Sequence, residues 1–299
     1  MIAKFLKYTE IRTKITSLFA FLMSIAYLFY TKCEINWNLM IIFFASMLIF
    51  DLTTTAINNY TDTKSNGQKL DFKRTTALMI IFIMLFISAG LGLYLVYLTD
   101  VVVLLIGIIC FICGILYTFG PVPISRQPLG ELLSGIFYGF MIPFLILYIN
   151  MPEGTFLTFS LSLKTIDLSL NIIPVFKLIL LSIIPVCTTA NIMLANNICD
   201  VERDILVNRF TLPYYLGKKS VYLFAGIYYA CYVDIIFMVV LNVLSPLCLI
   251  ALITIIPVHK NIRVFLKLQD KEKTFIVSIK NYILIMGSIT LIIFISGLF

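Results

Sequence analysis

Apolar runs long enough to cross a lipid bilayer recur from one end of this chain to the other. A transmembrane helix needs about 20 mainly apolar residues, because each residue rises ~1.5 Å and the hydrocarbon core is ~30 Å thick. Within lipid the backbone must satisfy its own hydrogen bonds, which favours helices over open sheets. The sequence therefore predicts an all-α, polytopic membrane protein.

We predict nine transmembrane helices, the eighth of which is the shortest. Their ranges are 15–31, 38–58, 75–98, 101–119, 128–150, 171–196, 219–242, 244–258 and 276–297. Only 12% of the residues are charged, about half the share in a soluble domain. No hydrophilic stretch reaches domain length, so we expect residues 1–299 to form one membrane-embedded domain.

The basic residues are distributed by loop, as membrane topology requires. Of the 22 Lys and Arg residues, all but Lys32, Lys164 and Lys177 fall on the side that holds the N-terminus. By the positive-inside rule that side is cytoplasmic, and the C-terminus lies outside. The net charge of +7 therefore reflects topology, and we expect the lipid bilayer rather than nucleic acid as a partner.

Two loops differ from the others in length or charge. Residues 151–170 form a long, weakly amphipathic external loop, which we expect to lie along the membrane interface. Residues 259–275 are basic and charged throughout, and we expect a cytoplasmic surface helix that binds anionic lipid.

One motif, N-N-x-x-D-x-x-x-[N/D], occurs twice, at residues 58–66 and 196–204. On a helix, its first Asn, its Asp and its last residue share one face, because they stand at i, i+4 and i+8. Each copy follows a long apolar run, and both lie at the cytoplasmic edge in the predicted topology. Acidic residues at membrane depth are costly and usually functional, although polar residues also gather where helices leave the membrane.

Carboxylate and amide oxygens suit Mg²⁺, which usually keeps water and substrate phosphate in its coordination shell. The candidate metal ligands are Asp62, Asn66, Asp200 and Asp204. The candidate substrate-binding amides around them are Asn58, Asn59, Asn196 and Asn197. Together these oxygens predict a site that holds a divalent cation and an anionic substrate.

Basic residues follow each copy of the motif. Lys69, Lys73 and Arg74 follow the first copy, and Arg209 follows the second. These side chains are candidates to neutralise a diphosphate, with Arg74 and Arg209 favoured because a guanidinium binds phosphate with two parallel hydrogen bonds. The alternative is that they serve only the positive-inside topology. Tyr117 is either a hydrogen-bonding aromatic in the site or a tyrosine of the interface belt.

Further motifs accompany these residues. The second copy is followed by Arg209-x-Thr211-Leu212 and by Leu216-Gly217. A third segment reads Gly120-Pro121-x-Pro123-Ile124, then Pro128-Leu129-Gly130-Glu131. Over nearly its whole length the chain resembles the UbiA superfamily of intramembrane aromatic prenyltransferases, and within it the naphthoate branch.

The resemblance implies nine helices around a central cavity that is capped on the cytoplasmic side. It implies Mg²⁺-dependent transfer of a polyprenyl group from polyprenyl diphosphate to an aromatic acid acceptor. In the naphthoate branch the acceptor is 1,4-dihydroxy-2-naphthoate, which loses its carboxylate, in menaquinone biosynthesis. Asp62, Asp200, Asp204, Arg74, Arg209 and Tyr117 are then the candidate catalytic residues. The expected location is the bacterial cytoplasmic membrane, with the active site opening to the cytoplasmic side.

The first motif departs from the family pattern, because Asn59 and Asn66 stand where Asp is common. Asp62 is then its only carboxylate, unless Asp51 or Asp71 compensates. Two other interpretations stay open at this point. One keeps the chemistry but changes the acceptor to 4-hydroxybenzoate, homogentisate or haem. The other is an ion-coupled transporter, although a transporter favours polar residues near the midplane of inverted repeats.

Overall fold

The computed structural model describes residues 1–65, 70–120, 123–162 and 164–299. Two of the predicted site residues, Asn66 and Lys69, lie outside the described residues, as does Pro121 of the third segment. The chain divides into two compact units. The first unit comprises Met1–Leu18, Asn36–Gly130 and Glu202–Thr211, and the second comprises Phe19–Ile35, Glu131–Val201 and Leu212–Phe299.

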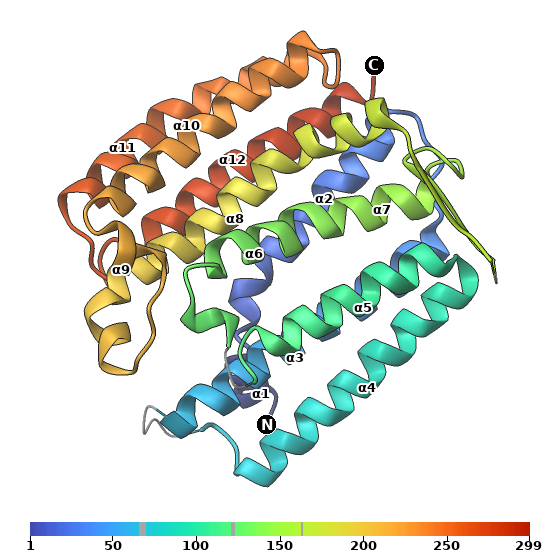
Figure 1. Cartoon of the computed structure of the whole chain (residues 1–299). Coiled ribbons are helices and arrows are strands. Elements are labelled where there is room, and N and C mark those ends of the chain that lie inside the picture. The colour runs from blue at the N-terminus through green and yellow to red at the C-terminus, as the bar shows by residue number, and fades with distance from the viewer. Residues whose placement is uncertain (66–69, 121–122, 163) are drawn as a thin grey trace. The chain divides into compact units, whose positions relative to one another are not determined.

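The first unit is built on the helix pair α3 (Trp37–Ser65) and α4 (Arg74–Leu98), with α5 (Val101–Leu116) beside them (Figure 1). Asp100 begins α5 as its N-cap and accepts hydrogen bonds from the backbone of Val102 and Val103, two of the donors that a helix start leaves unpaired. Three short helical elements complete this unit. They are α1 (Ile2–Tyr8), η1 (Ile11–Lys14) and η2 (Ile124–Arg126).

A buried cluster joins the N-terminal segment to these helices. Tyr8 packs with Ala56 and Ile57 of α3 and with Ala77 and Ile81 of α4. The Tyr8 hydroxyl also donates a 3.0 Å hydrogen bond to the Ala56 carbonyl. Tyr8 is therefore part of the core of the first unit and holds α1 against α3 and α4.

The second unit contains most of α2 (Ile15–Tyr30) and the longest helix, α8 (Ile172–Leu206), which continues into the first unit. Its helices α10, α11 and α12 lie side by side in Figure 1. Its remaining elements are α6 (Gly130–Ile136), η3 (Phe137–Met141), α7 (Ile142–Asn150), α9 (Leu212–Leu216), α10 (Lys219–Val240), η4 (Pro246–Thr254), α11 (Ile255–Lys267) and α12 (Ile276–Ser296).

Gly139 allows α8 to approach the helical segment 130–150 closely. It lies in η3, a π-helical turn between α6 and α7. A Cβ atom at this position would lie 2.2 Å from the Val186 backbone nitrogen and 2.5 Å from the Pro185 carbonyl carbon. The two backbones pack at a distance that only glycine permits, which agrees with the expectation that small residues mark close helix contacts in membranes.

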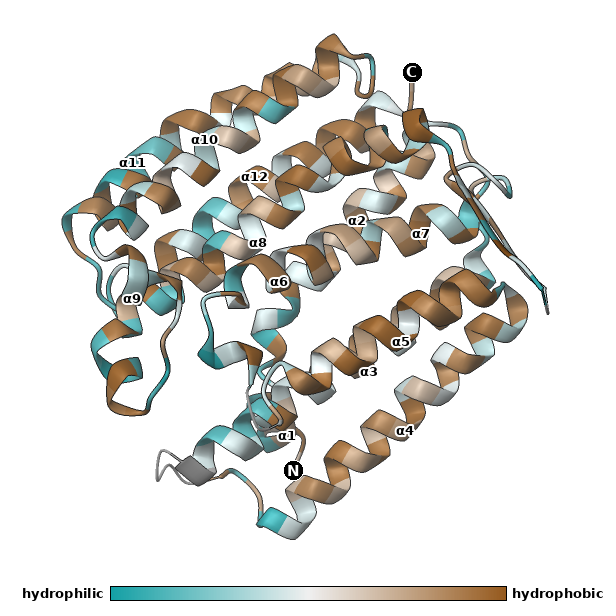
Figure 2. Cartoon of the chain, in the orientation of Figure 1, coloured by the Kyte–Doolittle hydropathy of each residue, from teal (hydrophilic) through white to brown (hydrophobic). Residues whose placement is uncertain are grey.

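The predicted apolar helices are present. Within the described residues, eight helical segments are long and apolar enough to cross a membrane, and α5 is a shorter apolar helix of 16 residues. Figure 2 shows apolar residues along the length of α4 and α5. The chain is therefore an integral, all-α membrane protein, as its hydrophobic runs predict.

Two predicted loops contain regular structure. Within the first, β1 (Leu157–Leu161) and β2 (Ile166–Leu170) pair antiparallel, with Leu157 opposite Leu170. Residues 255–267 form α11, which continues directly from the 3₁₀ segment η4 and does not start a separate surface helix. Val258, Ile262 and Phe265 form a buried stripe at helical spacing on α11, which leaves its charged side chains on the exposed face.

Candidate active site

The described residues of both copies of the motif, 58–65 and 196–204, are helical, as predicted. The first continues α3 through Ser65, and the second continues α8 through Leu206. The first copy belongs to the first unit. In the second copy, Asp200 belongs to the second unit and Asp204 to the first. The first copy and Asp204 are therefore described with the first unit, and Asp200 is described with the second.

The two asparagines of the first copy hold α3 to neighbouring segments. Asn58 Oδ1 accepts a 3.1 Å hydrogen bond from the Thr118 hydroxyl. Asn59 Nδ2 donates to the Tyr8 carbonyl at 2.9 Å and to Glu10 Oε1 at 3.1 Å. The amide nitrogen of Asn59 thus has a structural task that an aspartate could not perform, because a carboxylate has no N–H to donate.

Burial is the largest influence on the Asp62 carboxylate and disfavours its charged form. The guanidinium of Arg209 and, less strongly, that of Arg126 favour the charged form, while Glu10 opposes it. The sequence predicts Arg209 as a site residue. For Arg126 it indicates only a topological charge, because one arginine in a Gly- and Pro-rich turn carries no motif.

Arg209 also contacts the end of the second motif. Its Nε lies 3.7 Å from Asp204 Oδ2 and donates a 2.9 Å hydrogen bond to the Ser125 carbonyl. Its backbone nitrogen donates to the Asp204 carbonyl at 2.9 Å. One guanidinium therefore interacts with the two motif aspartates that belong to the first unit, Asp62 and Asp204.

Arg74 has a different environment from Arg209. Its Nη2 donates a 3.0 Å hydrogen bond to the Tyr60 carbonyl, and its guanidinium lies 4.8 Å from the centre of the Tyr60 ring. These contacts hold the end of α3 against the start of α4. Lys73, just before Arg74, is the exposed N-cap of α4.

Tyr117 follows the last residue of α5, in the third segment. Its carbonyl accepts a 2.8 Å hydrogen bond from the Ser125 backbone. A Cβ atom added to Gly130 would lie 3.1 Å from the Tyr117 hydroxyl oxygen, so this hydroxyl packs against Gly130. The tyrosine is thus held between the two ends of the third segment and not on an open helix face.

The second copy binds a cationic group within the second unit. Lys271 Nζ donates to Asn196 Oδ1 and, at 2.5 Å, to Asp200 Oδ2. The two oxygens stand one helical turn apart on α8 and converge on the same ammonium. The predicted oxygen face is therefore real, but its partner Lys271 comes from 71 residues away, which no local motif reveals.

Asn197 points into the packing of the second unit. Its Nδ2 donates a 2.8 Å hydrogen bond to Glu131 Oε1, and both side chains are buried. Glu131 Oε2 and Asn197 Oδ1 have no hydrogen-bond partner among the described residues. The role of Asn197 in substrate binding stays a prediction. The motif does not indicate that Glu131 is its hydrogen-bond partner.

The donor set fits a hard divalent cation. Asn196 and Asp200 converge on one ammonium, and their oxygens are of the kind that Mg²⁺ prefers. Among the residues that the structure describes, no three His, Cys, Asp or Glu side chains form a metal-binding group. Mg²⁺ would therefore need water and substrate oxygens to complete its shell.

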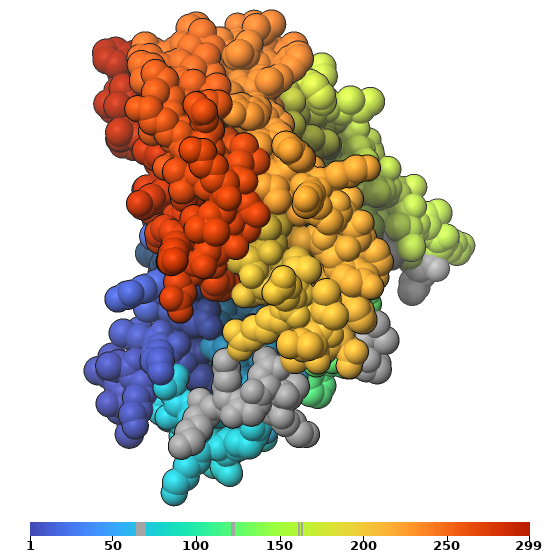
Figure 3. All heavy atoms as spheres, turned by 90° about the vertical axis from the view of Figure 1, so that its left-hand side faces the viewer, coloured from blue at the N-terminus to red at the C-terminus, as the bar shows by residue number. Residues whose placement is uncertain are grey.

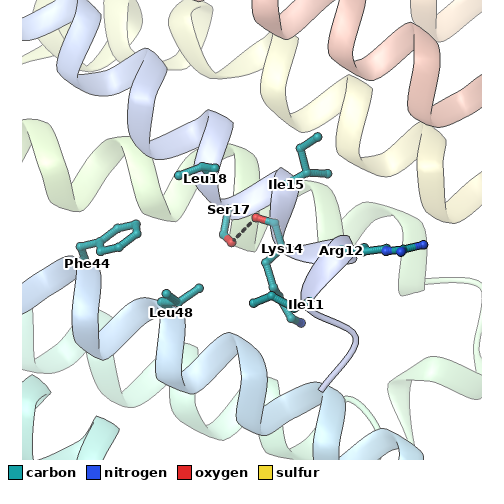
Figure 4. A pocket seen from close by; sticks show the side chains of 8 residues that line it. All are labelled: Ile11, Arg12, Lys14, Ile15, Ser17, Leu18, Phe44 and Leu48. Carbon is teal, nitrogen blue, oxygen red and sulfur yellow. Dashed lines mark hydrogen bonds between the residues drawn. The ribbon is translucent and has the colours of Figure 1, made fainter. Parts of the chain in front are cut away.

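Two hollows in the described residues are lined by residues of neither motif. One, of about 310 Å³, is lined by side chains of η1, of the start of α2 and of α3, among them Lys14, Phe44 and Leu48 (Figure 4). The other, of about 390 Å³, lies beside Tyr229 and His259 in the second unit. Neither is lined by a predicted site residue.

Comparisons with known proteins show which sequences and folds the chain resembles. A model of the UbiA prenyltransferase family matches residues 17–284. A 1,4-dihydroxy-2-naphthoate octaprenyltransferase of Bacillus subtilis (strain 168) is 28% identical over 232 residues, which cover 73% of this chain and 68% of the relative.

Solved structures share the fold. A structure of digeranylgeranylglyceryl phosphate synthase matches with a TM-score of 0.66 and 17% identity, over 99% of this chain and 98% of the other. A UbiA homologue from Archaeoglobus fulgidus, bound to GPP and Mg²⁺, matches with a TM-score of 0.63 and 12% identity, over 99% and 98%. A UbiA homologue from Aeropyrum pernix K1 matches with a TM-score of 0.65 and 15% identity, over 93% and 98%.

Proposed function

The chain belongs to the UbiA prenyltransferase family, and from that premise we propose that it transfers a polyprenyl group to 1,4-dihydroxy-2-naphthoate in an Mg²⁺-dependent reaction. The observation that carries the proposal is the convergence of Asn196 and Asp200 on one cationic group. Because the chain belongs to an enzyme family, we explain its acidic motifs by prenyl transfer and not by ion-coupled transport. The 28% identical relative, named for this acceptor, supports naphthoate.

In this proposal, the residues that would bind Mg²⁺ are Asp62 and Asn66 in the first motif and Asp200 and Asp204 in the second, and the neighbouring asparagines orient the substrate. When bound, Mg²⁺ neutralises negative charge that develops on the departing diphosphate. Arg209 and Arg126 are the positive charges that act on Asp62, and we assign to them the binding of diphosphate oxygens. Arg74, Lys69, Lys73 and Tyr117 stay as supporting candidates.

The chemistry needs no strong nucleophile from the protein. The C–O bond between the prenyl C1 and diphosphate breaks, and the ring carbon of the acceptor that bears the carboxylate forms the new C–C bond. Carbon dioxide then leaves, and the ring regains its aromaticity. Fixed cations stabilise the departing diphosphate and cost no reorganisation during the reaction, which is the task we assign to the two arginines.

We also propose that residues 1–299 act as one membrane domain of the bacterial cytoplasmic membrane. The distribution of Lys and Arg supports a cytoplasmic N-terminus and a site that opens to the cytoplasmic side. Cysteine labelling with a membrane-impermeant reagent, at an engineered cysteine in 1–10 or near 299, tests this orientation. Labelling of the N-terminal cysteine from the external side of intact cells would contradict it.

Product formation tests the proposed activity. Purified protein in detergent or liposomes is incubated with a polyprenyl diphosphate and 1,4-dihydroxy-2-naphthoate, with 4-hydroxybenzoate and homogentisate as competing acceptors. We expect a prenylated 1,4-naphthoquinol or its quinone oxidation product, detected by mass spectrometry, that disappears with EDTA and returns when Mg²⁺ is restored.

Variants locate the activity. Asp62→Asn and Asp200→Asn are expected to abolish product, while Asp167→Asn, which removes an acid from the exposed hairpin strand β2, leaves it unchanged. Product from both motif variants would contradict the site. Product only with 4-hydroxybenzoate or homogentisate would keep the chemistry and replace the acceptor.

A further inference from the structure

Lys271 stands in a fixed turn between α11 and α12. Asp270 organises this turn, because its Oδ1 accepts hydrogen bonds from the backbone nitrogens of Glu272 (3.0 Å) and Lys273 (2.8 Å). Asp270 and Thr274 are also joined by two further hydrogen bonds, from Asp270 N to Thr274 Oγ1 and from Thr274 Oγ1 to Asp270 O. Thr274 is buried, so the turn is anchored in the second unit.

The anchored turn directs the Lys271 side chain to α8. Its ammonium contacts Asn196 and Asp200 and lies 5.0 Å from the centre of the Phe275 ring. The Asp200 side chain is 20% exposed and that of Lys271 is 42% exposed. Figure 3 shows the segment around residue 270, coloured orange-red, at the surface of the second unit. The contact is therefore reachable from outside the unit.

This arrangement differs from an ordinary surface ion pair. A surface pair usually joins one carboxylate to one flexible lysine and contributes little. Here an amide oxygen and a carboxylate oxygen, one turn apart, bind the same ammonium, and a ring face and a capped turn fix its position. The ammonium thus occupies the point on which the oxygen face of the second motif converges.

We propose that Lys271 is the resident counter-ion of the second motif. It neutralises Asp200 while the motif holds no metal, and a divalent cation must displace it from Asn196 and Asp200 in order to bind. The displaced ammonium then lacks its anionic partner until the diphosphate of the donor arrives, so Lys271 favours binding of metal and diphosphate together over metal alone. This inference rests on the proposed function in taking the second motif as the metal site.

Metal binding without turnover tests the proposal. The full-length protein in detergent is titrated with Mn²⁺, and free Mn²⁺ is measured by electron paramagnetic resonance. We expect Lys271→Gln to bind Mn²⁺ severalfold more tightly than the wild type, because the competing cation is gone. Lys271→Arg keeps the charge and should bind like the wild type. Lys273→Gln is the matched control, since it removes the same charge from an exposed position of the same turn.

Chemical labelling tests the contact itself. With acetic anhydride and mass spectrometry, Lys271 should be modified more slowly than Lys273 in metal-free protein. Addition of Mg²⁺ should raise the labelling rate of Lys271 alone, and Asp200→Asn should raise it without metal.

Two outcomes would overturn the proposal. One is wild-type Mn²⁺ affinity in Lys271→Gln, and the other is an equal gain in Lys273→Gln, which would indicate a general effect of charge. These results are separate from the proposed function. A protein that shows the expected titrations but prenylates no tested acceptor keeps the counter-ion role and loses the assigned reaction.

Discussion

Lys14 Nζ lies 2.8 Å from Asp51 Oδ1, and the two side chains are only 6% and 5% exposed. The ammonium also donates to the Asp51 carbonyl at 2.9 Å and to the Thr55 hydroxyl, while Ser17 donates to Asp51 Oδ2 at 2.7 Å. This buried network ties the start of the first predicted span to α3. It also explains why Asp51 is present within an apolar helix. Because Lys14 and Ser17 bind both oxygens of the Asp51 carboxylate, this acid is already engaged and does not compensate freely for the asparagines of the first motif.

Removal of one partner of this pair should be strongly destabilising. Lys14→Met leaves the Asp51 carboxylate without its cation, and breaking a buried pair in this way costs about 3–5 kcal/mol. The double variant Lys14→Met/Asp51→Leu should recover most of that stability, because neither charge is then buried. Unfolding in mixed micelles, followed by circular dichroism, measures the free energy of unfolding.

The pair Lys7–Asp71 supplies a matched control. Its Nζ–Oδ1 distance is 2.9 Å, but the side chains are 76% and 27% exposed. Lys7→Met should change the free energy of unfolding by less than about 1 kcal/mol, because solvent screens exposed pairs. Equal losses in Lys7→Met and Lys14→Met would show that burial does not decide the strength of these contacts.

Gly139→Ala should disrupt the packing of the segment 130–150 against α8. The new methyl group would lie 2.2 Å from the Val186 backbone nitrogen, and a backbone atom of a long helix cannot move aside cheaply. We expect loss of folded protein in detergent, measured by size-exclusion chromatography and melting temperature. Gly226→Ala in α10 is the control, since no atom lies within 4 Å of the added methyl group. It should be neutral or slightly stabilising, because alanine favours helix by about 1 kcal/mol.

Substitutions of Arg209 and Arg74 should differ in their effect on kcat/KM. Arg209→Gln removes the main positive charge that acts on Asp62 and that contacts Asp204, so kcat/KM for the polyprenyl diphosphate should fall on the order of 10²-fold. Arg74→Gln should cost much less, because Arg74 is engaged with the carbonyl and ring of Tyr60. Initial rates at varied donor concentration measure both. Melting temperatures of the two variants exclude unfolding as the cause, and an equal loss in both would contradict the distinction.

The hydrophobic runs and the spacing of polar residues predict the local structure of this protein well. Eight predicted spans match helices within a few residues at most of their ends, since bilayer length and apolar content are properties of the segment itself. The helical register of the two motifs is likewise a local property. Contacts such as Lys271 with Asp200 and Lys14 with Asp51 join residues far apart in sequence, and tertiary packing determines them. No periodicity marks Lys271 or Arg126. The sequence therefore indicates only a topological role for Arg126, and for Lys271 a place in the basic segment 259–275 expected on anionic lipid.

The first motif carries Asn59 where aspartate is common in the family, and the structure gives a physical reason. Asn59 Nδ2 donates to the Tyr8 carbonyl and to Glu10 Oε1. In Asn59→Asp both hydrogen bonds are lost, and two carboxylates face one another across the former 3.1 Å contact. We expect a loss of about 1–3 kcal/mol in the free energy of unfolding, measured by unfolding in mixed micelles, rather than a gain in function. Adding Glu10→Gln to this variant should restore part of the stability, because the amide introduced at position 10 can donate to the new carboxylate. If Asn59→Asp alone were as stable as the wild type and bound Mn²⁺ more tightly, the asparagine would be a feature of the metal site and not a tie between α3 and the N-terminal segment.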